Sequence, residues 1–185
     1  MFERYTEAAR RALFFARYEV TQLGVTTIEP QHILLGVLRE SKGLVPRILE
    51  RTNISTSTLR QQIEARTEFR ERVPTSIEIP FSPATQRTLN YAAEEADRLK
   101  HDYIGTEHLL LGLLREDGSM AAELLAAGGL RLADGRTALI ELMQVAQAEA
   151  EAGGSASRGC SRSGAAALAP GCCPAPAAPA LSPSV

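Results

Sequence analysis

The segment from Ile104 to Glu116, IGTEHLLLGLLRE, has a near copy from Ile28 to Glu40, IEPQHILLGVLRE. The offset between the two copies is 76 positions throughout, and it superimposes His32 on His108. A match of this length at a constant offset indicates an internal duplication, which has to be identified before a fold is assigned. The sequence therefore predicts two structurally equivalent halves.

A helix is expected before each copy, over residues 6–23 and 82–99, because apolar residues recur there at three- and four-residue steps. Thr6 is expected to cap the first of these helices and Gly24 to end it. In the second half Ser82 precedes Pro83, a capping hydroxyl before a proline at the first helical position. The apolar faces consist of Ala9, Leu13, Ala16, Val20 and Leu23 in one half and Leu89, Ala92, Ala96 and Leu99 in the other.

The duplicated segment itself is predicted to be a helix that begins at Pro30, since proline is tolerated mainly at the first helical position. The offset then places Thr106 at the first position of the second copy. Gln31 and Glu107 follow in the first turns. The residues expected in the core are Leu34, Leu35 and Leu38 with Leu110, Leu111 and Leu114.

Both copies carry a glycine inside the predicted helix, Gly36 and Gly112. A glycine at such a position costs about 1 kcal/mol relative to alanine. Close packing against another helix is the simplest reason for retaining it in both halves.

A short third helix and a fourth helix are predicted to complete each half. Their expected bounds are Val45–Glu50 and Met120–Ala127 for the third helix, and about Thr58–Thr67 and about Gly135–Ala152 for the fourth. Ser57 or Thr58 is the candidate cap of one fourth helix, and Asp134 is the candidate cap of the other. Each half thus consists of four helices, and the predicted fold class is all-α.

The predicted domain extends from residue 1 to residue 152, with repeat 1 at about 1–68 and repeat 2 at about 81–152. The strand-like run Val73–Ile79 lies between the repeats and favours an extended linker over about 69–80. Residues 153–185 are rich in Ala, Gly, Pro and Ser, a composition that predicts a disordered tail. A frameshifted or truncated reading frame is an alternative explanation of that tail.

The composition is that of a soluble globular protein, with 44% hydrophobic and 23% charged residues. The net charge of −2 and the absence of a polybasic tract argue against nucleic acid or a membrane as partner. Cys160, Cys172 and Cys173 all fall in the tail, which suits a reducing compartment. With neither a signal peptide nor a transmembrane segment in the sequence, a cytoplasmic location is expected.

The sequence contains no GxxxxGK[ST], GxSxG, HExxH or CxxC motif, so the chain is not expected to be an enzyme or to hold a metal or another cofactor. His32, His101 and His108 are scattered. For the two histidines in the first turns, a bond to a nearby backbone or side-chain group is the expected role.

Glu107 allows two interpretations. A carboxylate in the first turn of a helix is favoured by the helix dipole alone. It can also accept two parallel hydrogen bonds from a guanidinium, while free backbone N–H groups at the helix start hold an anion. A ligand that carries both a guanidinium and a phosphoryl group would suit such a turn.

The pattern FxRxTxxA at the start, followed by the duplicated IGTEHLLLGLLRE, resembles the double N-terminal repeat domain of Clp-type AAA+ unfoldases, and most closely the ClpC branch. The resemblance covers Met1 to about Ala152. It implies two four-helix repeats packed as a pseudo-twofold domain. It also implies docking of client proteins, adaptor proteins or Clp ATPase subunits, including proteins phosphorylated on arginine.

In the second repeat, Glu107 matches the guanidinium-binding glutamate of the family, and Thr106 is part of the same turn. Ser82 takes the place of the helix-start threonine that helps to hold the phosphoryl group. In the first repeat Thr6 is present, but Gln31 replaces the glutamate, and a neutral amide cannot supply the charge-assisted pair. The resemblance therefore implies one intact and one impaired phosphoarginine site.

Members of the family normally continue into two ATPase modules, which this sequence lacks. The function expected from the resemblance is recognition of proteins in Clp quality control, without catalysis. Two alternatives remain: the chain is the N-terminal fragment of an ATP-dependent unfoldase, or it is a structural module that has lost ligand binding.

Overall fold

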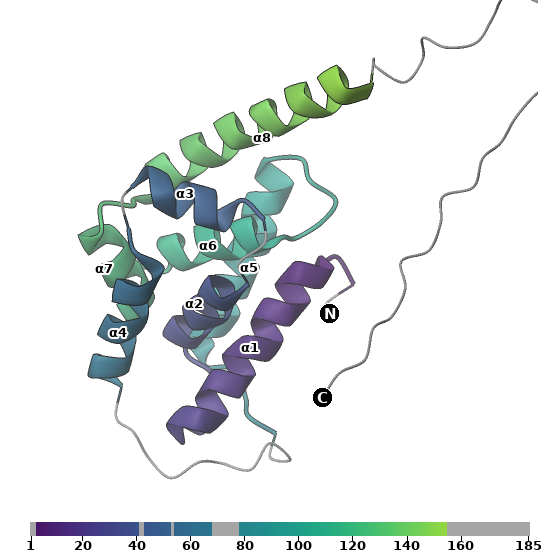
Figure 1. Ribbon diagram of the computed structural model, residues 1–185. Helices are drawn as coiled ribbons and strands as arrows, with labels where there is room; N and C mark the ends of the chain where they lie inside the picture. The colour runs from purple at the N-terminus through teal and green to yellow at the C-terminus, as the bar shows by residue number, and fades with distance from the viewer. Residues whose placement is uncertain (1–2, 41–42, 53, 68–77, 155–185) are drawn as a thin grey trace, which may run out of the picture. The chain divides into compact units, whose positions relative to one another are not determined.

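A computed structural model describes residues 3–40, 43–52, 54–67 and 78–154, with side chains described as far as residue 145. The fold is all-α, as predicted, and eight helices make up the described part of the chain (Figure 1). In order, they are α1 (Glu7–Leu23), α2 (Pro30–Arg39), α3 (Val45–Arg51), α4 (Thr56–Arg66), α5 (Pro83–Arg98), α6 (Thr106–Arg115), α7 (Met120–Ala127) and α8 (Leu132–Gly154).

The arrangement repeats itself after four helices, so α1–α4 and α5–α8 are the two predicted repeats. The described residues up to Ala148 form one compact unit. Most of the linker predicted at about 69–80, and the tail prediction from residue 155 onward, lie outside the described residues. Residues 153 and 154 still belong to α8.

The first helix of each repeat begins as its sequence predicts, and α1 ends as predicted at Leu23, whereas α5 ends at Arg98, one residue before its predicted end. The Thr6 hydroxyl accepts a hydrogen bond from Ala9 N at 3.2 Å, and the Ser82 hydroxyl accepts one from Thr85 N at 3.1 Å. Gly24 follows α1 in the left-handed conformation with φ 73°. Lys100, its equivalent after α5, adopts φ 59°, a conformation that glycine reaches more easily. The turn is therefore conserved between the repeats even where the glycine is not.

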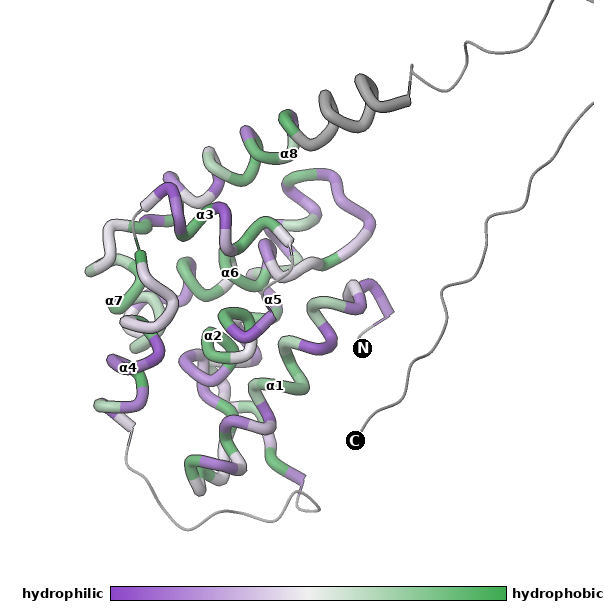
Figure 2. Tube along the Cα trace, viewed as in Figure 1, coloured by the Kyte–Doolittle hydropathy of each residue, from purple (hydrophilic) through white to green (hydrophobic). Residues whose placement is uncertain are grey.

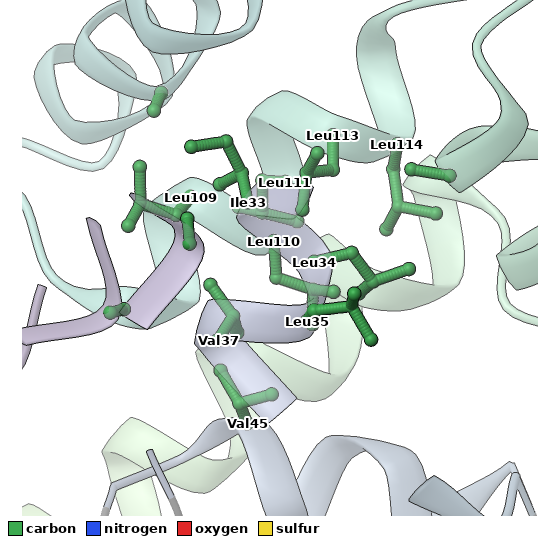
Figure 3. Close-up of a cluster of buried hydrophobic side chains, with 14 of the residues drawn as sticks. Ile33, Leu34, Leu35, Val37, Val45, Leu109, Leu110, Leu111, Leu113 and Leu114 are labelled. Atoms are coloured by element: carbon green, nitrogen blue, oxygen red, sulfur yellow. The ribbon is translucent and has the colours of Figure 1, made fainter. Parts of the chain in front are cut away.

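The duplicated helices α2 and α6 supply the centre of the core. Figure 3 shows Leu34 and Leu35 of α2 in one cluster with Leu110 and Leu111 of α6, and none of the four is more than 1% exposed. Hydrophobic residues recur along both helices in Figure 2. Leu38 is the exception among the predicted core leucines, since it is only half-buried.

Close helix packing explains the glycine in each duplicated helix, as predicted. A Cβ atom added to Gly36 would lie 2.8 Å from Ala16 N of α1, and one added to Gly112 would lie 2.9 Å from Ala92 N of α5. Both distances are too short for a real side chain. Each repeat therefore depends on the same backbone contact between its first and second helices.

The predicted starts of the two fourth helices were wrong. α4 begins at Thr56, so Ser55 precedes it instead of Ser57 or Thr58. α8 begins at Leu132, which leaves Asp134 inside its first turn. The physical reason in α8 is that Gly135 N already donates to Arg131 O at 2.9 Å, so the helical hydrogen bonds start one turn before the predicted start.

A pair of ion-pair clusters, which sequence analysis did not identify, ties the helices of each repeat together. Glu19 of α1 accepts from Arg39 at 3.0 Å and from Arg60 at 2.9 Å. The equivalent Glu95 of α5 accepts from Arg115 at 3.3 Å and from Arg136 at 2.8 Å. The carboxylates are buried, and each joins the first, second and fourth helices of its repeat.

Candidate functional site

The two repeats meet through two short backbone contacts, and each contact joins the start of a first helix to the start of a second helix from the other repeat. Thr6 N donates to Ile104 O at 3.0 Å, beside an isolated bridge between Tyr5 and Ile104. Ser82 N donates to Ile28 O at 3.0 Å, beside the bridge between Ile28 and Phe81. The helix starts are therefore paired across the repeats.

This pairing corrects the grouping of the candidate residues. Sequence analysis assigned Ser82 to Glu107 and Thr6 to Gln31, because each pair belongs to one repeat. The structure brings Thr6 to the α6 turn that carries Thr106 and Glu107, which we call the α1–α6 junction. It brings Ser82 to the α2 turn that carries Gln31, which we call the α5–α2 junction.

At the α1–α6 junction the Glu107 carboxylate folds back against the helix start. The residue is only 8% exposed. Its Oε2 lies 3.4 Å from the Thr106 hydroxyl, and its Oε1 lies 3.5 Å from His108 Nδ1. A Cβ atom at Gly105 would meet Oε2 at 2.5 Å, so this position of the carboxylate requires the glycine that precedes α6.

The electrostatic environment of Glu107 disfavours its charge. Burial raises the pKa of the carboxyl, and hydrogen bonds from its own backbone N–H and from Thr106 offset only part of that rise. Among the described residues, no lysine or arginine lies within 4.0 Å of this carboxylate. Glu107 is therefore a buried acid without a cationic partner in the described part of the protein.

The other buried glutamates of the described chain all have arginine partners. Glu19 and Glu95 each hold two arginines in the clusters described above. Glu40 pairs with Arg11 at 2.9 Å, and the equivalent Glu116 pairs with Arg87. The lack of an arginine thus sets Glu107 apart from the glutamates that stabilise the fold.

His108 has the structural role that the sequence predicted. Its Nδ1 accepts a hydrogen bond from Gly105 N at 2.9 Å, so the neutral ring carries its proton on Nε2, which lies 2.8 Å from His101 Nδ1. Burial lowers the pKa of His108 to about 4. The ring is therefore neutral at ordinary pH and cannot balance the charge of Glu107.

The rings of His101 and Tyr103 lie next to His108, on the side toward solvent. His101 and Tyr103 stack with their centroids 5.2 Å apart and their planes 2° from parallel. Burial and the neighbouring Glu107 carboxylate both raise the pKa of Tyr103, whose side chain is partly exposed. Sequence analysis did not assign these two residues to the site. The signal it missed is that the first repeat has Val25 and Thr27 at the same positions.

The α5–α2 junction has the same histidine–backbone hydrogen bond as the α1–α6 junction, but Gln31 stands where the other junction has Glu107. His32 Nδ1 accepts from Glu29 N at 3.0 Å, as its equivalent does in the second repeat. Its Nε2 is buried and has no hydrogen-bond partner among the described residues, because Val25 replaces the histidine that would accept from it. Burial lowers the pKa of His32 to about 4.

A cavity of about 250 Å³ lies beside this second junction. Its walls include Gln31 and the ion pair in which Arg87 Nε lies 3.1 Å from Glu116 Oε1. The Ser82 hydroxyl lies 3.0 Å from the Thr85 hydroxyl and is buried. Because Gln31 is neutral and Glu116 already has its arginine, the junction offers a guanidinium no unpaired buried carboxylate among these residues.

Within the described ranges, no group of three or more His, Cys, Asp or Glu side chains is placed to hold a metal ion. The described helices also include none that is long and apolar enough to cross a membrane.

The model of the Clp repeat (R) N-terminal domain family matches residues 4–128 and, in a second match, residues 80–168. The chain belongs to this family. The ClpA homologue of Guillardia theta is 38% identical over 143 residues, which are 77% of this chain and 17% of that protein. Chloroplastic ClpC2 of Oryza sativa is also 38% identical over 143 residues, 77% of this chain and 16% of that protein. The chain thus spans about a sixth of the length of these relatives.

Solved structures of Clp N-terminal domains share the fold. The N-terminal domain of ClpD from Arabidopsis thaliana has a TM-score of 0.60 and 27% identity, with 77% of this chain and 97% of that chain covered. The Hsp104 N-terminal domain of Candida albicans has a TM-score of 0.62 and 19% identity, with 76% and 92% covered. The matched region is an N-terminal Clp domain. The cytoplasmic location stays a prediction, since the Oryza relative is chloroplastic.

Proposed function

We propose that this Clp N-terminal domain recognises client or adaptor proteins by binding a phosphorylated arginine at the α1–α6 junction. The observation that carries the proposal is Glu107, the buried carboxylate that has no arginine partner among the described residues. A guanidinium that enters the junction supplies the missing cation through two parallel hydrogen bonds.

The same junction suits a phosphoryl group. The first N–H groups of a helix have no intrahelical partner, and the helix dipole favours an anion at that end. Here the starts of α1 and α6 lie next to each other, with the hydroxyls of Thr6 and Thr106 beside them. An anion attached to the guanidinium would find hydrogen-bond donors from both helices.

The resemblance to peptide-binding domains of this fold supports a protein partner. A ClpV N-domain has been solved in complex with a VipB peptide, and it matches this chain with a TM-score of 0.58 and 19% identity. That likeness concerns the fold alone. The chemistry of recognition in the present chain is inferred from Glu107.

Calorimetric titration with phosphoarginine tests the proposal. Glu107→Gln retains the shape of the side chain but removes the charge, so binding should weaken by about 1–3 kcal/mol, the scale of a charge-assisted hydrogen bond. The exposed Glu50→Gln is the matched control and should bind as the wild type does. An absence of heat with the wild type, or equal affinity in Glu107→Gln, would refute the assignment.

The Glu107→Gln variant also has a stability signature that separates it from a misfolded protein. Because the pKa of Glu107 is raised in the folded state, the group contributes most stability below its unfolded pKa and loses it as the pH rises through the folded pKa. At neutral pH the variant should therefore be more stable than the wild type, by about 1 kcal/mol, the lower end of the cost of a poorly satisfied buried polar group.

A second proposal follows from the length of the relatives, in which this domain is about a sixth of the protein. The domain is then the N-terminal part of an ATP-dependent ClpC-type unfoldase and presents bound proteins to ATPase modules. Sequencing the DNA downstream of the coding region in all frames tests this. A Walker-type phosphate-binding loop there supports the proposal, and its absence argues for a free-standing recognition domain.

A further inference from the structure

Tyr103 is an exposed aromatic residue of the α1–α6 junction, and the proposed function so far assigns it no role. The residue is 41% exposed. One face of its ring lies on His101, and the ring of His108 meets it edge to face with centroids 5.8 Å apart. Burial and the Glu107 carboxylate both raise the pKa of Tyr103, so the carboxylate is near enough to act on the phenol. An exposed ring therefore borders the buried acid.

Elsewhere in this fold, a carboxylate and an aromatic ring hold an arginine together. In repeat 1, Arg39 Nη1 lies 3.0 Å from Glu19 Oε1, and the guanidinium carbon lies 4.7 Å from the centroid of the Phe15 ring. A guanidinium is planar, so it can donate hydrogen bonds in its plane while its face stacks on an aromatic ring. The carboxylate and the ring thus bind different sides of one cation.

The equivalent residues of repeat 2 form the same arrangement. Arg115 Nη1 lies 3.3 Å from Glu95 Oε1, and its guanidinium carbon lies 4.5 Å from the centroid of the Tyr91 ring. The α1–α6 junction also has a carboxylate, Glu107, and a ring, Tyr103. Among the described arginines, none lies within 4.0 Å of this carboxylate, and those that lie over aromatic rings lie over other rings. The junction thus provides both partners of a guanidinium and, in the described part of the chain, no guanidinium.

The ring and the acid of the junction occur together in repeat 2 and are both replaced in repeat 1. At the offset of 76 positions, Thr27 stands in place of Tyr103 and Gln31 in place of Glu107. The arrangement of arginine, carboxylate and ring that joins the first helix to the second is present in both repeats. Tyr103 therefore accompanies the acid of the junction and not the packing that the repeats share.

We propose, on the basis of the function proposed above, that Tyr103 determines the specificity of the α1–α6 junction: its ring stacks on the guanidinium of a phosphorylated arginine while Glu107 accepts hydrogen bonds from the guanidinium edge. Stacking requires a planar cation, so the junction selects a guanidinium over the compact ammonium of a phosphorylated lysine. His101 is a positioning residue, because it supports one face of the Tyr103 ring and is itself held at 2.8 Å by His108.

Proton NMR of phosphoarginine in the presence of the whole chain tests where the ring lies. The δ-methylene protons next to the bound guanidinium should move to lower chemical shift, because an aromatic ring shields nuclei above its face. In Tyr103→Leu this ring-current shift should disappear, whereas Tyr103→Phe should retain it. A purely structural role of Tyr103 would leave the ligand without such a shift even in the wild type.

Calorimetric titration of the same variants measures the contribution to affinity. Tyr103→Leu should weaken phosphoarginine binding about fivefold, the scale of a cation–π contact at an exposed site. Tyr103→Phe keeps the ring and should bind as the wild type does. The matched control is Tyr18→Leu, since Tyr18 is similarly exposed at 39% and lies about 18 Å from Thr6 along α1 at 1.5 Å per residue. Its affinity should be that of the wild type.

Competition with Nε-phospholysine tests the selectivity. In the wild type this ligand should displace phosphoarginine only at higher concentration than phosphoarginine itself requires, and the difference should narrow in Tyr103→Leu. Circular dichroism melting shows whether each variant is folded, and Tyr103→Thr, which introduces the residue of repeat 1, provides a second variant without the ring.

The results separate this proposal from the function on which it rests. If Glu107→Gln weakens phosphoarginine binding while Tyr103→Leu and Tyr103→Thr do not, or if the ligand shows no ring-current shift, the role of Tyr103 is refuted and the role of Glu107 stands. If the wild type does not bind phosphoarginine, or Glu107→Gln binds it equally well, both proposals fail. Weaker binding in Tyr103→Leu together with a ring-current shift in the wild type supports both.

Discussion

The first turn of α2 carries Pro30 and Gln31, whereas the equivalent turn of α6 carries Thr106 and Glu107. Around both turns the scaffold is the same, because His32 and His108 each accept a hydrogen bond from the backbone N–H three residues before them. Leu34 and Leu35 behind the α2 turn are as deeply buried as Leu110 and Leu111 behind the α6 turn. The comparison shows that a helix start can gain or lose a buried charge while its packing stays unchanged.

The ion pairs extend the comparison. Glu19 and Glu95 hold equivalent arginines, and so do Glu40 and Glu116, which means that the acids that stabilise the fold occur in both repeats. Glu107 occurs in only one repeat and has no arginine partner in the described part of the chain. A buried charge without a partner is costly to a fold, which favours the proposed role of Glu107 in binding over a role in stability.

The largest expected effect concerns the two histidines together. The pKa of both His32 and His108 is lowered to about 4, so the stability they contribute is present above their unfolded pKa and is lost as the pH falls toward 4. Between pH 7 and pH 5 the free energy of unfolding should fall by about 2 kcal/mol per histidine. Urea denaturation over this pH range measures the loss of unfolding free energy. In His32→Gln this free energy should depend less steeply on pH than in the wild type. A pH-independent stability of the wild type would show that the rings are not buried as described.

The next largest effect is expected from disturbing the close contact between the first and second helices, which occurs in both repeats. Gly36→Ala forces a methyl group against the backbone of α1, and overpacking of this kind costs about 3 kcal/mol. Gly112→Ala should cost a similar amount in the second repeat. Chemical denaturation of both variants checks this, with the exposed Gln61→Ala as control; a loss in only one repeat would mean that the two contacts are not equivalent.

A smaller effect follows from making the two histidine environments alike. His101→Val gives the second repeat the residue of the first and leaves His108 Nε2 without its hydrogen-bond partner. The free energy of unfolding should fall by about 1–2 kcal/mol, the cost of an unsatisfied buried donor. The reverse change, Val25→His, should raise it by supplying His32 Nε2 with a partner. Thermal melting follows both; the same direction of change in the two variants would contradict the account.

The smallest effect is expected from a substitution that makes the first turn of α2 more like that of α6. Gln31→Glu restores the acid of the α5–α2 junction and should improve phosphoarginine binding there by about 1 kcal/mol, the difference between a neutral and a charge-assisted hydrogen bond. Titration in the Glu107→Gln background isolates this junction. Unchanged affinity would mean that the nearby Arg87 and Glu116 ion pair, or the backbone of the turn, excludes the ligand.

Local signals in the sequence predicted the fold well. Thr6, Ser82 and Pro30 mark helix starts through hydrogen bonds and ring geometry that involve only near neighbours, and each prediction was confirmed. The starts of α4 and α8 were mispredicted because Ser57 and Asp134 are equally compatible with a position inside the first turn. Helix existence was therefore more predictable than helix boundaries.

The candidate site was less predictable, because its proposed members come from different repeats. The duplication shows that Thr6 is equivalent to Ser82, but it does not show that Thr6 lies beside the α6 turn. The lack of an arginine beside Glu107 among the described residues could not be predicted either, since it depends on where the arginines lie in space. Once the offset is known, the sequence shows that the first repeat has Val25 where the second has His101. The meaning of this difference becomes clear only in the structure, where His108 Nε2 lies 2.8 Å from His101 Nδ1.

The central claim is that Glu107 is a buried acid held ready for a guanidinium. The most direct test is NMR titration of its side-chain carboxyl carbon, with and without saturating phosphoarginine. Without ligand the pKa should lie above the ordinary value of a glutamate, since burial raises it. With ligand it should fall below that value, since a bound guanidinium stabilises the carboxylate. An ordinary pKa in the free protein, or one that phosphoarginine leaves unchanged, would contradict the account.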